Sequence, residues 1–339
     1  MTAETAGLVC AHHHLYSTLA RGMPAPPQTP VQFRDVLEQV WWRLDAALDL
    51  EMIRWSATLG AVEALQAGCT AIIDHHESPN AIEGSLSVIA DACADVGVRV
   101  VCAYGVTDRH GVDGARRGLA ENDRFLRKGG RGMVGIHAAF TCSDATLEAA
   151  ADLAMLHRVG VHMHVGEGPD DDAAGARLAP LAQDNWLLVH AVRLDETLPG
   201  TVVHNPRSNM NNGVGYARPM RFTNRVALGT DGIGADMLEE FRIAFVRHRE
   251  HDLQASPEVA WGWLENGYDL VPEARGDRVL WSYDHADSPW HVAYTPGIRA
   301  VDVDIDGLAV LRGGLPTRVD LTEVRARAAE QATRLHSLL

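Results

Sequence analysis

The chain has 339 residues, of which 46% are hydrophobic and 22% charged, so it can bury one barrel-sized domain and an appended element. Its formal charge of −15 argues against binding nucleic acid or a membrane through a general basic surface. The sequence has no apolar run of membrane-spanning length and no basic-then-apolar secretory signal, so we expect a cytoplasmic protein. Five cysteines without CxxC spacing predict reduced thiols rather than a cysteine-ligated zinc.

The first apolar run, GLVCAHHHLYS at residues 7–17, ends in three histidines. In a strand, side chains alternate in direction, so His12 and His14 would point to one side and His13 to the other. Two convergent imidazoles can form half of a metal site. The alternative is a remnant of an affinity tag. However, this triplet closes a buried-looking strand instead of standing in a Gly/Ser linker.

A proline-rich loop at residues 23–30 follows, and it can form a mouth or lid beside these histidines. Apolar residues at helical spacing then predict helices over 36–47 and 52–67. From there, short apolar runs alternate with helical stretches. With the first strand, they predict eight strands, the others being 70–75, 99–106, 133–139, 161–165, 186–192, 201–204 and 226–229.

This alternation is typical of parallel β/α units, and eight of them predict an α/β fold with a closed, TIM-like (β/α)8 barrel over residues 1–271. An open doubly wound sheet is the alternative, but a glycine-rich phosphate loop is missing from the sequence. The connection between His190 and Thr201 is short for a crossover helix. Residues 272–316 predict strands of a partial β-sandwich, and 317–339 predict a C-terminal helix.

Polar residues close most of the predicted strands, and active sites of such barrels lie at these carboxyl ends. Taken singly, each histidine could be a core residue that is hydrogen-bonded to the backbone. Taken together, these polar residues predict one active-site opening at the carboxyl ends of the strands. The residues are His12, His14, His75, His76, His137, His164, Glu167, His190, His204 and Asp231. Histidines from strands one and five with a carboxylate from strand eight could bind a metal and acidify its water. The only lysine, Lys128, precedes strand four, which ends in His137, so a bridging carboxylated lysine is not expected and one ion is favoured.

Several segments resemble the amidohydrolase superfamily, specifically the SsnA-type aminohydrolases near guanine deaminases and triazine chlorohydrolases. They lie within residues 7–270 and are GLVCAHHHLYS, AGCTAIIDHHESP, HMHVGEG, LLVHAVRLD, VVHNPRSNMNNGVGY and ALGTDGIGADMLEEFRIAFVRHR. The resemblance implies that one divalent ion, zinc or alternatively iron, is held by four ligands. These ligands are His12, His14, His164 and Asp231.

The same resemblance assigns roles to five further residues. Glu167 matches the acid that carries a proton to the substrate, and His190 matches the histidine that orients the water. His137, Arg207 and Asn209 fall at positions that look substrate-facing. With Asp231 accepting the proton of the water together with His190, this set fits hydrolytic deamination.

We therefore expect a hydrolase of non-peptide carbon–nitrogen bonds that deaminates a purine-like or related nitrogen heterocycle, a small-molecule substrate. A triazine-type chlorohydrolase is the first alternative. Glu167 argues against it, because a departing chloride needs less protonation than an amine. The second alternative is a family member without catalytic activity. The intact set of metal ligands argues against this alternative.

One departure from the family concerns the chain ends. Relatives begin with a segment that forms a small β-sandwich with the C-terminal strands, whereas this sequence starts almost at the first barrel strand. With the N-terminal part of the sandwich missing, we expect the C-terminal strands to lack partners. An unpaired apolar sheet edge favours association, so a homo-oligomer, most simply a dimer, is expected.

Overall fold

The computed structural model describes residues 3–339, and eight parallel strands lie at the centre of this part of the chain. All eight are found where the sequence predicted strands. Except for two residues of β4, their side chains are buried throughout, as expected for strands covered on both faces. In chain order they are β2 (Leu8–His13), β3 (Cys69–His76), β4 (Arg99–Tyr104), β5 (Val134–Ala138), β6 (Val161–Val165), β7 (Leu187–His190), β8 (Thr201–His204) and β9 (Val226–Leu228).

The strands follow one another in barrel order but form two sheets, β2-β3-β4 and β5-β6-β7-β8-β9. At one seam, a single bridge joins His13 to Asp231, and the Thr230 and Asp231 amides donate to the His12 carbonyl at 3.0 and 3.1 Å. Single bridges at Cys102 and Val106 link the sheets at the other seam. The predicted α/β class is confirmed. The predicted closed barrel is not, because the ladder is interrupted at both seams, one of them beside the three-residue strand β9.

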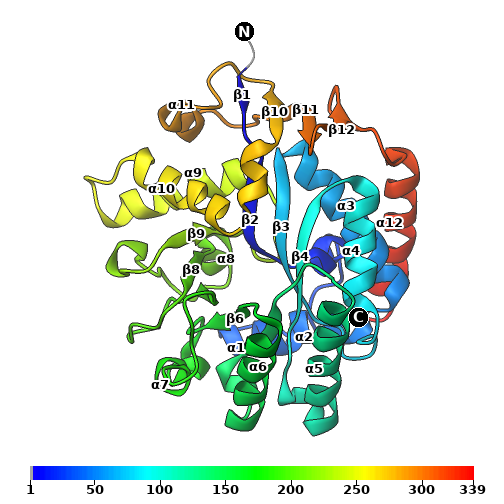
Figure 1. Cartoon of the computed structure of the whole chain (residues 1–339), viewed down its shortest axis with the longest axis vertical. Helices are drawn as coiled ribbons and strands as arrows, with labels where there is room; N and C mark the ends of the chain where they lie inside the picture. The colour runs from blue at the N-terminus through cyan, green and yellow to red at the C-terminus, as the bar shows by residue number, and fades with distance from the viewer. Residues whose placement is uncertain (1–2) are drawn as a thin grey trace.

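Helices follow most of the strands and cover their outer side (Figure 1). Those of the repeating units are α4 (Ser85–Val96), α5 (Gly111–Arg127), α6 (Asp144–His157), α7 (Ala174–Leu178), α8 (Pro206–Asn211), α9 (Met237–His251) and α10 (Pro257–Glu265). Strands β7 and β8 are joined without an α-helix, at the connection whose shortness the sequence had indicated. Sequential strand order also rejects the doubly wound alternative.

The excursion between β2 and β3 shapes the mouth of the eight-stranded core. It contains α1 (Phe33–Val36), a π-helical turn (Leu37–Trp41), α2 (Trp42–Ala47) and α3 (Leu50–Gln66). The helix predicted over 36–47 is thus interrupted by a wider turn, a feature that often accompanies functional sites. Asp49 caps α3 by accepting from the Met52 amide at 2.8 Å.

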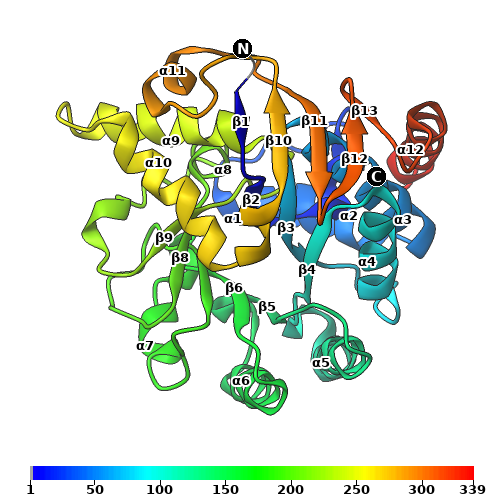
Figure 2. The same ribbon diagram turned by 45° about the horizontal axis from the view of Figure 1, so that its top comes forward.

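The chain ends form a separate antiparallel sheet of five strands, in the order β1-β10-β11-β12-β13 within residues 3–339. Its strands are β1 (Glu4–Thr5), β10 (Arg278–Trp281), β11 (Ala300–Ile305), β12 (Leu308–Arg312) and β13 (Leu315–Pro316). Figure 2 shows β1 beside β10. The expectation that the C-terminal strands lack partners is therefore wrong, because they pair with one another and with β1.

Two contacts anchor the C-terminal region to the core. Arg99 at the start of β4 pairs with the buried carboxylate of Asp277. The terminal helix α12 (Leu321–His336) packs against α3, where Arg334 donates to Asp49 at 2.7 Å (Figure 1). A short helix, α11 (Pro289–Tyr294), was not anticipated. Within residues 3–339, no helix combines the length and apolar character needed to cross a bilayer.

Candidate active site

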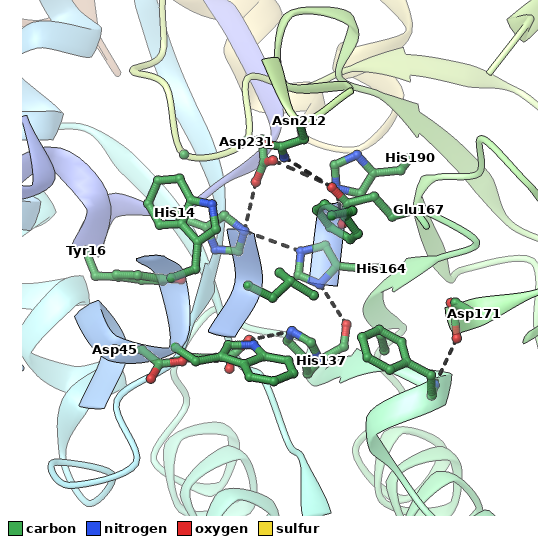
Figure 3. Close-up of a pocket in the computed structure, with 18 residues that line it drawn as sticks. His14, Tyr16, Asp45, His137, His164, Glu167, Asp171, His190, Asn212 and Asp231 are labelled. Atoms are coloured by element: carbon green, nitrogen blue, oxygen red, sulfur yellow. Dashed lines mark hydrogen bonds and ion pairs between the residues drawn. The ribbon is translucent and has the colours of Figure 1, made fainter. Parts of the chain in front are cut away.

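Four side chains converge at the carboxyl ends of β2, β6 and β9, and Figure 3 shows three of them, His14, His164 and Asp231. His14 Nε2 lies 2.9 Å from Asp231 Oδ1 and 3.3 Å from His164 Nε2. His12 Nε2 lies 3.3 Å from the same oxygen of Asp231. The candidate ligand atoms of His12, His164, His190 and Asp231 all fall within 4.8 Å of one another. The structure thus brings together the four residues that the sequence proposed as metal ligands.

The far side of each imidazole is held by a second partner. His14 Nδ1 donates to the His75 carbonyl at 2.6 Å, and His164 Nδ1 donates to the His137 carbonyl at 2.7 Å. When the ring is neutral, a hydrogen on Nδ1 leaves a lone pair on Nε2 directed at the cluster, which is the arrangement that metal-binding histidines adopt. His12 Nδ1 lies 2.8 Å from His162 Nε2, so a buried imidazole takes the place of a carbonyl there.

The charges of this cluster fit a cation. Burial opposes protonation of His14, but the Asp231 carboxylate outweighs it and raises the pKa of His14 to about 9. Burial likewise disfavours the charge on Asp231, yet its hydrogen bonds to His12 and His14 hold its pKa well below the usual range. A carboxylate at the edge of three buried imidazoles is a donor set of the kind that divalent zinc or iron takes.

Glu167 and His190 lie beside this cluster. His190 Nε2 is 3.5 Å from Glu167 Oε2 and 3.9 Å from Asp231 Oδ2. Burial and the neighbouring Asp231 carboxylate raise the pKa of Glu167 well above its ordinary value, which favours the protonated form of this carboxyl group. Asn212 donates to Glu167 Oε1 at 3.4 Å. The arrangement places a potential proton donor and a neutral imidazole on the same wall of the cavity.

The backbone is strained at this wall. Three residues without a glycine's freedom have positive φ: His190 at 70°, Ala191 at 50° and Asp231 at 54°. Such conformations cost about 1–3 kcal/mol each and concentrate at functional sites. Gly166, between His164 and Glu167, has φ 56°, and a Cβ there would come 2.9 Å from the Leu194 amide nitrogen. These backbone conformations direct the side chains of His190, Glu167 and Asp231 into the cavity.

The three predicted substrate-facing residues are placed differently from one another. His137 lines the cavity. Asn209 does not line it; its Oδ1 instead accepts from His190 Nδ1 at 2.7 Å, which fixes the imidazole of His190. Arg207 is turned away, donating to the Ile233 carbonyl and pairing with the buried carboxylate of Glu240. Both residues therefore support the site from behind, because α8 directs them toward β7 and α9.

The opposite wall of the cavity was not anticipated from the sequence. It is lined by aromatic and acidic side chains and one leucine, namely Tyr16, Phe33, Leu37, Trp41, Trp42, Asp45, Glu77 and Phe140. Most come from the excursion that follows the proline-rich loop predicted as a mouth. Glu77 directly follows the end of β3, so its position after DHH was the available signal.

A buried ion network supports this wall. Arg109 pairs with both Glu77 and Asp45, at 3.2 Å for Asp45, and its guanidinium lies 4.3 Å from the Trp42 ring centroid. Burial raises the pKa of Asp45 well above its usual range, and the Glu77 carboxylate adds to the effect. Burial also raises the pKa of Glu77, but the Arg109 guanidinium opposes it. The guanidinium of Arg109 thus stabilises the charged form of both carboxylates against the effect of burial.

Comparisons with known proteins identify the family of this chain. The sequence profile of the amidohydrolase family matches residues 5–261. The 5'-deoxyadenosine deaminase of Methanopyrus kandleri is 31% identical, over 98% of this chain and 86% of that protein.

Two solved structures share the fold. A zinc-bound adenosine deaminase from Xanthomonas campestris superposes with a TM-score of 0.83 at 22% identity, over 99% of this chain and 86% of that one. The zinc complex of atrazine chlorohydrolase from Arthrobacter aurescens gives a TM-score of 0.75 at 19% identity, over 97% and 88% of the two chains.

Proposed function

Since this chain belongs to the amidohydrolase family, we propose that it is a metal-dependent deaminase that removes an amino group from a purine-like heterocycle. The observation that carries this proposal is the convergence of the imidazoles and Asp231 on one point, with the carboxyl group of Glu167 3.5 Å from His190 on the same wall. The similarity to a 5'-deoxyadenosine deaminase supports an adenine-type leaving amine. Within the family, the HNPRSNMNN and LGTDGIG segments support a place among the SsnA-type aminohydrolases.

His12, His14, His164 and Asp231 would hold one divalent ion, zinc or alternatively iron, because Nε2 of His14 lies close to both Asp231 and His164. Another group of four close donors has His190 in place of His14. When bound, the ion supplies Lewis-acid chemistry that makes a water molecule nucleophilic near neutral pH. A third group of close donors, His14, His75 and His164, shares two members with the first. Because His14 and His164 already belong to the proposed ligand set, this group does not offer an independent second site.

Each proton transfer of the proposed reaction is carried out by different residues around the ion. Asp231 and His190 accept the proton that leaves the attacking water. Glu167 gives its proton to the ring nitrogen beside the attacked carbon, and proton return to the departing group releases ammonia. The carbon–nitrogen bond breaks, a ring carbonyl forms, and one water is consumed for each ammonia released. Asn209 keeps the Nε2 lone pair of His190 directed at the cavity by accepting from Nδ1.

Ammonia release by purified, zinc-loaded protein tests the proposal, with adenine, adenosine, 5'-deoxyadenosine and cytosine as probes. We expect turnover of at least one purine amine and loss of that turnover when zinc is removed by a chelator. Chloride release from atrazine, without ammonia release from any amine, would instead favour the chlorohydrolase function that the fold also supports. Zinc binding without either reaction would favour a silent family member.

A further inference from the structure

The interior of the eight-stranded core holds a contact between two imidazoles, one of which has no part in the proposed reaction. His162 precedes His164 by two residues on β6, so both side chains point to the same face of the strand, with His162 one layer deeper. His162 is 0% exposed, and its Nε2 lies 2.8 Å from His12 Nδ1. The two rings are almost perpendicular, at 86°, with centroids 4.9 Å apart. A side chain therefore holds His12 from behind, whereas backbone carbonyls hold His14 and His164.

The role of His12 as a ligand fixes where the hydrogens of this contact lie. His12 Nε2 faces the cluster, 3.3 Å from Asp231 Oδ1, and it must be free of hydrogen to bind an ion. The one hydrogen of the neutral His12 ring is then on Nδ1, where it points at His162. Two N–H groups cannot share a gap of 2.8 Å, so His162 Nε2 has to be the acceptor.

An imidazole in this place differs from a carbonyl because it can also donate. If His162 Nε2 carries the hydrogen, it donates to His12 Nδ1, and the hydrogen of His12 lies on Nε2, where Asp231 Oδ1 accepts it at 3.3 Å. That arrangement satisfies the contact but blocks the Nε2 lone pair. In the ion-binding arrangement, the hydrogen of His162 lies on Nδ1, a buried atom to which residues 3–339 offer no hydrogen-bond partner. The tautomer of His162 therefore decides whether His12 can bind an ion.

We propose that His162 is a positioning residue of the metal site, which keeps the imidazole of His12 in its ion-binding tautomer by accepting the hydrogen of Nδ1. This inference rests on one part of the proposed function, the role of His12 as a metal ligand. It concerns the affinity for the ion and not the identity of the substrate. The alternative is that His162 only fills space in the core, and variants that differ in the reach of one amide group separate the two roles.

Zinc affinity, measured by competition with a chromophoric chelator, tests the role of this hydrogen bond. His162→Leu fills the core but removes the acceptor, so we expect the Kd for zinc to rise by about tenfold to a hundredfold, the usual cost of losing the partner of a metal-bound histidine. His162→Gln places an amide oxygen near the position of Nε2 and should stay within a few-fold of the wild type. His162→Asn carries the same amide on a shorter side chain that does not reach His12, and it should lose affinity as His162→Leu does.

The tautomers can also be read in the wild-type protein, so the test does not depend on the folding of a variant. Long-range proton–nitrogen spectra of zinc-loaded protein, labelled with nitrogen-15 in its histidines, distinguish a ring nitrogen that carries hydrogen from one that does not. The signals of His162 are assigned by their loss in His162→Gln. We expect hydrogen on Nδ1 of both His12 and His162. Hydrogen on Nε2 of His162 in the zinc-loaded protein would overturn the proposal.

A control variant and the remaining outcomes complete the test. His248→Leu removes another buried histidine, on α9, whose Nδ1 lies 3.1 Å from the Tyr216 hydroxyl, and it should leave zinc affinity unchanged. Wild-type zinc affinity in His162→Leu, or equal affinities in His162→Gln and His162→Asn, would overturn the positioning role. Neither measurement needs turnover. Zinc binding with the expected tautomers, but without ammonia release from any amine, would uphold the role of His162 and reject the deaminase function.

Discussion

The two walls of the cavity are built by different means. On one wall, His14 and His164 stand at strand ends and are fixed by the carbonyls of neighbouring strands. On the other, Trp42 comes from a helical excursion and Glu77 is held by Arg109, a side chain from the following β/α unit. In the proposed reaction, the first wall would supply the metal ligands and the proton-transfer groups, and the second would contact the rest of the substrate. Chemistry and selectivity can therefore be perturbed separately.

Removing a ligand should have the largest effect. His164→Ala deletes an imidazole whose Nε2 lies 3.3 Å from that of His14, so we expect loss of the bound ion and of measurable turnover. Metal analysis of the purified protein should give about one divalent ion per wild-type chain and close to none for the variant. Two tightly held ions per wild-type chain would contradict the single-ion site.

Glu167→Gln should leave the metal in place and reduce turnover by about a hundredfold or more, the scale for losing a positioned acid. The amide keeps the size of the side chain and its contact with Asn212, so folding should be unaffected. A substrate analogue whose leaving group departs without protonation is the control and should lose much less. Equal losses on both substrates would remove Glu167 from the proton transfer.

Asn209→Ala tests whether Asn209 orients the imidazole of His190. Without the acceptor at 2.7 Å, His190 can rotate or change tautomer, and we expect kcat to fall about tenfold to a hundredfold with metal content unchanged. Asn209→Asp retains an oxygen at this position and should recover much of the loss. A fall in kcat that Asn209→Asp fails to relieve would argue that Asn209 acts only through folding.

The same division explains what the sequence could predict. Parallel strands buried on both faces are continuous apolar runs, and polar residues that end them, such as His164 and Asp231, must meet at one end of the core. Register at the seams and the π-helical turn depend on packing between distant segments, which local patterns do not record. Arg207 and Asn209 lie in a recognisable motif, but only the orientation of α8 decides that they face away from the cavity.

Trp42→Phe should produce the smallest effect and should act on the second wall alone. The phenyl ring keeps an aromatic surface beside Arg109, whose guanidinium lies 4.3 Å from the indole, but it covers less of the cavity and interacts more weakly with a cation. We expect KM to rise about twofold to fivefold while kcat and metal content stay unchanged, because no group on the first wall moves. Trp261→Phe, on α10 and outside the cavity lining, is a matched substitution that should change neither constant. If kcat fell in Trp42→Phe as steeply as in Asn209→Ala, the two walls would be coupled, and the separation of chemistry from selectivity would fail.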